Sequence, residues 1–398
     1  MKNKSSLSLI FLTVFIDLLG FGILIPILPT FSTIELNLNE FSIGLVLAIY
    51  SLTQFIFGPI LGNLSDRVGR RPLIIGCLFL NAVGYVIFAF TNSFMLLLIS
   101  RVVAGVGGSS VAVAQAYIAD ITTKDNRSKG MGMIGAAFGL GFVFGPLIGG
   151  FLSKYGYEVT GFASASFSFM AFLFTIFFLP ESLKKTADHA TKKVRKLVDI
   201  PAVKVLFKNN KIAFLIIMFF ILVFSVANIY GTFALIGYKV YKFNDMQNGI
   251  MYGIIGIVSA GVQGGLLRII TKYFSDAKIV IGAAFLMMIG LAMIPYAGNM
   301  SGLIIVTVVL AFGTGSLQPT MLSLISKNTS DTEQGFTLGV NQSFSAFARV
   351  LGPLWGGFAF EYIGYQYPFL TGAAFTAIIL ISSIYYLPKL LATKNIDD

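Results

Sequence analysis

The chain has 398 residues, of which 56% are hydrophobic and only 11% are charged. A soluble domain usually carries about 25% charged residues, so this composition excludes an ordinary soluble protein. The formal net charge of +11 would suit nucleic-acid binding, but the Lys and Arg residues lie in connectors between apolar segments, which is typical of a membrane protein. A single cysteine, Cys77, excludes a disulfide within the chain, and neither it nor the single His189 predicts a metal site.

Apolar segments of roughly 20 residues, the length that crosses a bilayer, recur from end to end. The first runs from about Leu7 to Pro29 and is too long for the core of a cleavable signal peptide, so we expect it to be retained. The sequence therefore predicts an all-α polytopic membrane protein with twelve transmembrane helices. Their expected limits are 7–30, 41–63, 72–91, 95–119, 129–154, 160–180, 211–237, 246–270, 277–297, 301–326, 334–360 and 364–388.

The connectors alternate in charge along the chain. The turns at 63–72, 122–129 and 271–278, the long segment 181–210 and both termini carry most of the Lys and Arg, whereas FTNSF and AGNMS carry none. The positive-inside rule therefore places both termini and the central segment in the cytoplasm. Segment 181–210 is expected to be a solvated linker, with a helix lying on anionic head groups as the alternative.

Two halves of the chain resemble each other. GPLIGG at 145–150 returns as GPLWGG at 352–357, an offset of 207 residues, and FFLP ending at Pro180 returns as YYLP ending at Pro388. This duplication predicts two pseudo-symmetric six-helix bundles, residues 1–180 and 211–398, joined by the cytoplasmic loop 181–210. Transporters often place a substrate site near the midplane between two such repeats.

Four motifs resemble those of the major facilitator superfamily. GNLSDRVGRRP, from Gly62, is similar to its cytoplasmic loop between spans 2 and 3. DLLGFGILIPILP, RVVAGVGGSS and GAAFGLGFVFGPLIGG resemble motifs of its twelve-span drug:proton antiporters, and the subgroup that the chain most resembles is the tetracycline exporters and their relatives. The resemblance covers nearly the whole chain.

The resemblance implies a secondary active transporter in the inner membrane of a bacterium. It would export a hydrophobic or amphipathic small molecule, multidrug or tetracycline-like, in exchange for protons and by alternating access. The implied partners are that substrate, protons and the lipid bilayer, with no nucleic acid and no cofactor, and we expect a monomer. No P-loop or nucleophile–base pair occurs in the sequence, so an enzyme is not predicted.

The motif at 62–72 concentrates charge between two apolar helices. Its glycines allow a tight turn and its arginines hold the turn in the cytoplasm, but neither role explains Asp66. The resemblance implies that Asp66, Arg70 and Asp120 form a lock that holds the two halves in the outward-facing state; the alternative is a role in topology alone. The other members of the loop motif are Gly62, Arg67, Gly69 and Arg71.

Three ionisable residues lie deep in predicted spans: Asp17, Arg101 and Arg349. Such charges are rare in membranes and usually face a cavity or a partner. Because burial penalises its charged form, Asp17 could take up and release a proton; alternatively it binds polar neighbours without titrating. Arg101 could contact span-5 carbonyls near Gly145–Pro146 or respond to Asp17. Arg349 could bind an anionic substrate group, although structural pairing is favoured.

Small and polar residues mark two further features. Closely spaced glycines in the fifth span predict tight helix packing, and the resemblance adds an antiporter-specific role as a seam between the halves; its members are Gly141, Gly145, Pro146, Gly149 and Gly150. Unpaired amides are costly in lipid, so uncharged polar residues inside spans are expected to line a substrate cavity. They are Gln54, Gln115, Asn228, Gln263, Gln318 and Asn341.

The chain also departs from the tetracycline exporters. These carry further acids on spans 3 and 9 and a histidine on span 8, where this sequence has Gly84, Met287 and Ser259. Proton coupling would then depend on Asp17. Two alternatives stay open: a proton-coupled uptake symporter of a metabolite, and a non-transporting receptor or lipid-handling protein on the same scaffold.

Overall fold

The computed structural model describes residues 2–183, 206–329 and 334–388, and these ranges are helical with no strand. The linker prediction for 184–205 lies outside the described residues. Eleven of the described helices are long and apolar enough to cross a membrane. The remaining predicted span, 334–360, corresponds to α14 (Gln334–Tyr362), a 29-residue helix that includes Asn341, Ser345 and Arg349.

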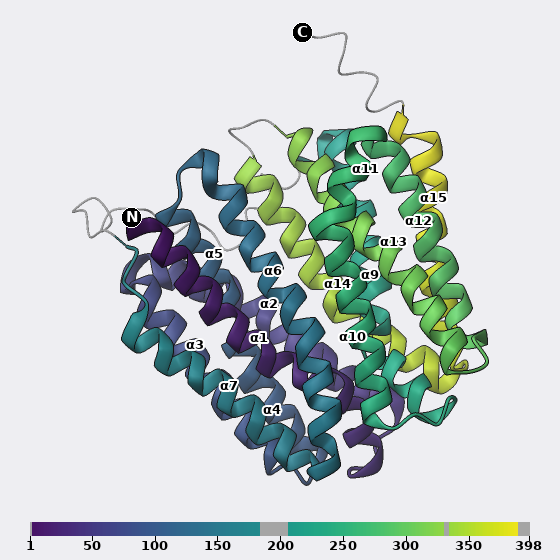
Figure 1. The fold of residues 1–398 in the computed structure, drawn as a ribbon, viewed down its shortest axis with the longest axis horizontal. Helices are drawn as coiled ribbons and strands as arrows, with labels where there is room; N and C mark the ends of the chain where they lie inside the picture. Colours follow the sequence, from purple (N-terminus) through teal and green to yellow (C-terminus); the bar gives the residue numbers. More distant parts are fainter. Residues whose placement is uncertain (1, 184–205, 330–333, 389–398) are drawn as a thin grey trace. The chain divides into compact units, whose positions relative to one another are not determined.

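Within each half of the chain, the helices follow one another with short connections (Figure 1). The first half of the chain contains α1 (Lys2–Ile34), α2 (Glu40–Val68), α3 (Arg70–Ala89), α4 (Phe94–Gly107), α5 (Ser110–Ile121), α6 (Lys124–Leu152), the short turn η1 (Ser153–Tyr155) and α7 (Tyr157–Phe178). The helices α4 and α5 form one span, Phe94–Ile121, with a short interruption at Gly108 and Ser109.

The second half of the chain is also helical. It contains α9 (Asn210–Lys239), α10 (Asp245–Gly261), a π-helical turn η3 (Val262–Leu266), α11 (Leu267–Tyr273), α12 (Asp276–Met293), η4 (Ile294–Tyr296), α13 (Met300–Lys327), α14 and α15 (Tyr367–Tyr385). A π-helical turn interrupts the regular bonding of a helix, and here it separates α10 from α11 within one span, Asp245–Tyr273.

Most of the helices extend past their apolar segments. The prediction of a turn over 63–72 is wrong, because α2 continues to Val68 and α3 begins at Arg70, which leaves only Gly69 between them. Charged side chains at a membrane surface do not interrupt a helix. The reversal occurs at Gly69, whose φ of +115° is readily adopted only by glycine. Gly62 lies inside α2 and does not form the turn.

The chain divides into two compact units that differ from the predicted halves at two short segments. Unit 1 contains residues 1–39, 46–198 and 243–253, and unit 2 contains residues 40–45, 199–242 and 254–398. Each unit therefore includes a few residues from the start of a helix whose remainder belongs to the other unit.

Contacts inside each unit explain this exchange. In unit 2, Glu40 pairs with Lys239, and the backbone N–H of Phe41 donates to Glu361 at 2.8 Å. In unit 1, a Cβ added to Gly150 would lie 2.6 Å from the carbonyl oxygen of Asp245. Helix starts that approach this closely need small residues at the crossing.

Glycines also allow a close helix pair in each unit. A Cβ on Gly145 of α6 would lie 2.6 Å from Gly22 of α1, and a Cβ on Gly352 of α14 would lie 2.7 Å from Asn228 of α9. The repeated GPLxGG motif therefore performs the same packing in both units. In unit 1 it lets α1 pack closely beside α6 (Figure 1), and α1 carries Asp17.

Candidate transport site

The carboxylate of Asp17 is buried in unit 1, with 5% of the residue exposed. Its Oδ1 accepts hydrogen bonds from Ser168 Oγ at 2.7 Å and from Asn81 Nδ2 at 3.0 Å. Its Oδ2 accepts from the same Asn81 nitrogen at 3.0 Å and from Ser110 Oγ at 3.3 Å. These donors come from α3, α5 and α7 and all are neutral. Within the described residues, no cation lies at ion-pair distance from Asp17.

Small residues make room for this arrangement. A Cβ on Gly20, one turn from Asp17, would lie 2.8 Å from the carbonyl oxygen of Ser164 and 3.2 Å from Ser168 Oγ. A Cβ on Gly107 would lie 2.5 Å from Asn81 Oδ1. The interruption after α4 places Ser110 at the start of α5, where its hydroxyl reaches Asp17. Larger side chains at either glycine would displace the donors from the carboxylate.

Arg101 is also buried, at 3% exposure, and is surrounded by aromatic rings. Its Cζ lies 5.4 Å from the ring centroid of Phe88 and 5.9 Å from that of Tyr85. Its Nη2 donates a hydrogen bond to Ser100 Oγ at 2.9 Å. Such stacking partly offsets the cost of burying the cation. The predicted contact with the Gly145–Pro146 carbonyls does not occur among the described hydrogen bonds, and both Arg101 Nε and the Tyr85 hydroxyl are buried without a hydrogen-bond partner.

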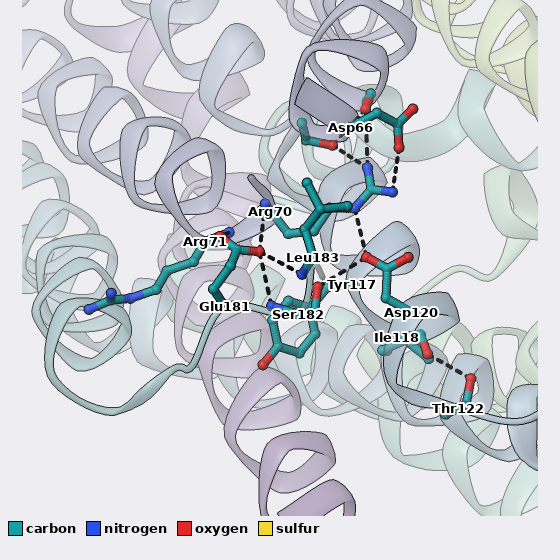
Figure 2. Close-up of polar contacts among 12 residues, drawn as sticks. Asp66, Arg70, Arg71, Tyr117, Ile118, Asp120, Thr122, Glu181, Ser182 and Leu183 are labelled. Carbon is teal, nitrogen blue, oxygen red and sulfur yellow. Dashed lines mark hydrogen bonds and ion pairs between the residues drawn. The ribbon is translucent and has the colours of Figure 1, made fainter. Parts of the chain in front are cut away.

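The charged motif assembles around Arg70 at the junction of α2 and α3 (Figure 2). The Arg70 guanidinium donates through Nη2 to Asp66 at 2.5 Å and through Nε to Asp120 at 2.9 Å. Its Nη1 donates to Ser65 Oγ at 2.5 Å and to the Gly62 carbonyl at 3.3 Å. The structure thus brings the three predicted lock residues together, all inside unit 1. Their role in holding the two halves stays a prediction.

Glu181 adds a second support to this junction (Figure 2). It follows α7 and accepts the backbone N–H groups of Arg70 at 3.0 Å and Arg71 at 3.1 Å. These are free donors at the first turn of α3, where a carboxylate is favoured. A Cβ on Gly69 would lie 2.6 Å from Glu181 Oε2, so glycine is required there for this contact as well as for the turn. Arg71 Nη2 in turn donates to the Ile176 carbonyl at 2.5 Å, whereas Arg67 is exposed.

The glycines of α6 divide by the surface that they contact. Gly141, Gly145 and Gly149 lie against α1, and Gly150 lies against Asp245 and Met246. The Pro146 carbonyl meets Gly249 on α10. Packing is therefore their observed role, and the antiporter-specific role stays a prediction.

The predicted cavity residues differ in how deeply they are buried. Asn228 is fully buried and donates to the Pro368 carbonyl, so it packs α9 against α15 and does not support a place on a cavity wall. Asn341 is also buried, Gln54 and Gln115 are half-buried, and Gln263 and Gln318 are exposed. Gln54 donates to the Gly108 carbonyl at 2.8 Å. Arg349 is half-buried in unit 2, in electrostatic range of Tyr230. A cavity role for the amides other than Asn228 stays a prediction.

Comparisons with known proteins agree with this architecture. The sequence model of the Major Facilitator Superfamily matches residues 10–306 and 269–395. The chain belongs to the major facilitator superfamily. It is 30% identical to the tetracycline resistance protein of class B from Escherichia coli over 96% of each chain, and 30% identical to multidrug resistance protein 1 of Bacillus subtilis over 95% of each. The crystal structure of the human organic anion transporter MFSD10 (TETRAN) has a TM-score of 0.71 and 24% identity, covering 96% of this chain and 100% of that one.

Membership of the major facilitator superfamily makes the chain a membrane transport protein and not an enzyme. It also gives a setting for the three positions that depart from the tetracycline exporters. A Cβ on Gly84 would lie 2.8 Å from Ala104, and a Cβ on Gly313 would lie 2.5 Å from the backbone of Met287. Gly84 and the fully buried Met287 are therefore tight packing positions, whereas Ser259 is half-buried and donates to the Ala311 carbonyl at 3.5 Å.

Sequence reasoning missed the residues that hold this superfamily member's buried acid. Asn81, Ser110 and Ser168 were not among the expected site residues, and neither was Glu181. A signal exists on α7, where Thr160, Ser164, Ser168 and Thr175 are all buried. Their spacing of four or seven residues marks one helix face that carries small polar groups into the bundle.

Proposed function

We propose that this transporter exports a hydrophobic or amphipathic small molecule in exchange for protons, with Asp17 as the proton-binding group. The observation that carries this proposal is a buried carboxylate held only by neutral donors. A buried charge without a counter-ion is costly in a membrane, and a proton would neutralise it, since no ion pair to Asp17 occurs within the described part of the chain. The names of the relatives from Escherichia coli and Bacillus subtilis support export of drug-like compounds.

The test of coupling is uphill transport in proteoliposomes with an imposed pH gradient. Asp17→Asn keeps the shape of the side chain and removes its ionisation, so we expect loss of concentrative efflux with downhill exchange retained. Asp276→Asn is the matched control, because Asp276 pairs with Lys327 at 2.6 Å near the ends of their helices. A mutant at position 17 that still concentrates substrate contradicts the proposal. Reversing the gradient separates antiport from uptake symport, and a lack of counterflow identifies a non-transporting protein.

The substrate is best sought with a panel of drugs in an efflux-deficient host. Gly84 and Met287 occupy tightly packed positions that cannot hold the additional acids of the tetracycline exporters without rearrangement. We therefore expect resistance to lipophilic compounds beyond tetracycline. Resistance to tetracycline alone would overturn this part of the proposal.

A second candidate is an amphipathic substrate with an anionic group, and Arg101 favours it. This cation is 3% exposed and has no acidic partner within the part of the chain that the structure describes. An unpaired buried charge is strongly destabilising, and an anionic substrate would compensate it. Arg101→Gln should weaken transport of a carboxylate substrate more than of its neutral ester. Equal losses for the two compounds would count against this candidate.

We further propose that the Arg70 cluster is a conformational lock. Arg70 joins α2 to α5 through Asp66 and Asp120, and all three of its guanidinium nitrogens donate hydrogen bonds. Asp66→Asn should lower the transport rate while expression and substrate binding persist. Arg67→Gln is the control, since Arg67 is exposed in the same turn of α2. Unchanged transport in Asp66→Asn would leave the motif with a topological role only.

The protein is proposed to act as a monomer in the inner membrane of a bacterium, with both termini in the cytoplasm. The distribution of Lys and Arg supports this orientation. A cysteine placed at position 192 should be protected from an external thiol reagent, and one placed at Asn299, which is exposed, should react. The native Cys77 is 2% exposed and gives little background. The opposite labelling pattern would overturn the orientation.

A further inference from the structure

The hydrogen bonds to Asp17 fit its ionised form completely. Four bonds from Asn81, Ser110 and Ser168 reach the two carboxylate oxygens, and in each the protein atom is the donor. A protonated carboxyl group would instead carry one O–H that needs an acceptor. A proton-coupling site must hold both forms, so at least one of the three neighbours has to become an acceptor.

Asn81 has the acceptor that this requires. Its Nδ2 contacts both oxygens of Asp17, while its Oδ1 is buried and makes no hydrogen bond. An unsatisfied buried acceptor costs free energy and needs a reason. A half-turn of the amide about χ2 would exchange the two atoms and present Oδ1 to Asp17. Gly107 leaves space on that side, because a Cβ there would lie 2.5 Å from Asn81 Oδ1.

We infer that Asn81 is a positioning residue that donates to ionised Asp17 and, after an amide half-turn, accepts a hydrogen bond from protonated Asp17. This inference rests on the proposed function of Asp17 as the proton-binding group. The amide would let the site change its protonation state without moving α3 away from α1. Serine hydroxyls rotate with the same freedom, but neither Ser110 nor Ser168 has an unsatisfied atom in this structure.

The electrostatic surroundings of Asp17 are simple. On α3, Cys77 and Tyr85 lie in electrostatic range, and Arg101 on α4 lies beside Tyr85. The described residues of α5, α6 and α7 present no ionisable group to Asp17, only the hydroxyls of Ser110 and Ser168. A response of the Asn81 amide to pH therefore reports mainly on the proton of Asp17.

Infrared difference spectroscopy on the full-length protein with isotope-labelled asparagine tests the inference. Between high and low pH, we expect a labelled amide carbonyl band to shift with the same midpoint as the carboxyl band of Asp17. Asp17→Asn should abolish both changes, and Asn81→Leu should remove the amide band. Labelled amide bands that stay constant while the carboxyl band titrates would overturn the inference, and so would the absence of any titrating Asp17 band.

A second pair of variants keeps the test independent of how well Asn81→Leu folds. Ser168→Ala removes the shortest donor to Asp17, so both bands should move together to a midpoint about one pH unit higher. Ser166→Ala is the control, because Ser166 is exposed on the same helix and donates to the Phe162 carbonyl at 2.8 Å. Bands that separate in Ser168→Ala would show that Asn81 does not follow the Asp17 proton.

The outcomes also separate this inference from the proposed function. If the two bands titrate together but Asp17→Asn still concentrates substrate, the amide switch holds and Asp17 is not the coupling group. If Asp17→Asn abolishes uphill transport while the amide band is constant, coupling holds and the role of Asn81 fails.

Discussion

Removing the Glu181 carboxylate should loosen the first turn of α3. Glu181 accepts the N–H groups of Arg70 and Arg71, at 3.0 and 3.1 Å, across more than 100 residues of sequence. Loss of a helix N-cap costs about 0.5–2 kcal/mol, and loss of an anion at a helix N-terminus costs a further 0.3–1 kcal/mol or so. For Glu181→Ala we therefore expect the free energy of local opening to fall by about 2 kcal/mol. Glu181→Gln keeps only one of the two acceptor oxygens, so it should lose the charge and one of the two hydrogen bonds, and its loss should be intermediate.

Hydrogen exchange measured by mass spectrometry reads this loss directly, because amide exchange follows local opening. A loss of about 2 kcal/mol corresponds to roughly 30-fold faster exchange in a peptide that contains Arg70 and Arg71. Glu181→Gln should give a smaller rise than Glu181→Ala, because one of the two N–H groups keeps its acceptor. Glu158→Gln is the control, since Glu158 is exposed in the first turn of α7. Equal exchange in the wild type and in Glu181→Ala would refute the capping role.

Three further predictions concern stability. Gly145→Ala would place a Cβ 2.6 Å from Gly22 and should lower the melting temperature in detergent micelles by several degrees, whereas Gly139→Ala meets nothing within 4 Å and should not; equal melting of the two would contradict the packing argument. Asn209 accepts from the N–H groups of Lys211 and Ile212, so Asn209→Ala should cost about 1 kcal/mol of denaturant stability while Asn209→Asp retains it. Burial raises the pKa of Tyr241, whose hydroxyl donates to the Ile294 carbonyl at 2.5 Å. The contribution of this neutral hydroxyl to folding stability is complete below about pH 10 and is lost as pH rises through the raised pKa. Tyr241→Phe should therefore flatten the alkaline fall in melting temperature, and an unchanged fall would refute this.

The fold was largely predictable from the sequence because a membrane span can be recognised by its length and hydropathy. The expected span at 211–237, for example, corresponds to α9 at Asn210–Lys239. The ends of helices were less predictable, since hydropathy falls at the membrane surface while helical bonding continues. Where a turn was expected over 63–72, the structure therefore has a single turn residue, Gly69, and the charged residues expected in a loop lie at the ends of helices.

The candidate site was predictable only in part. Asp17 and the cluster of Asp66, Arg70 and Asp120 stood out because charge is rare in this chain. Asn81 and Ser168 did not, because a neutral polar residue in a span carries no sign of which neighbour it faces. Which neighbour such a residue faces depends on the rotation of its helix about the helix axis, and packing against the neighbouring helices determines that rotation.

The exchange of short segments between the two units has a consequence for biosynthesis. Unit 1 includes residues 243–253, and unit 2 includes residues 40–45. The ribosome synthesises residues 40–45 some 300 residues before Gly357, which packs against them. Neither unit can reach its final packing when only the first half of the chain has been synthesised. Unit 1 must therefore remain incompletely packed in the membrane until residues 243–253 follow. A fragment that ends at residue 198 lacks part of unit 1, whereas one that ends at residue 253 contains all of it.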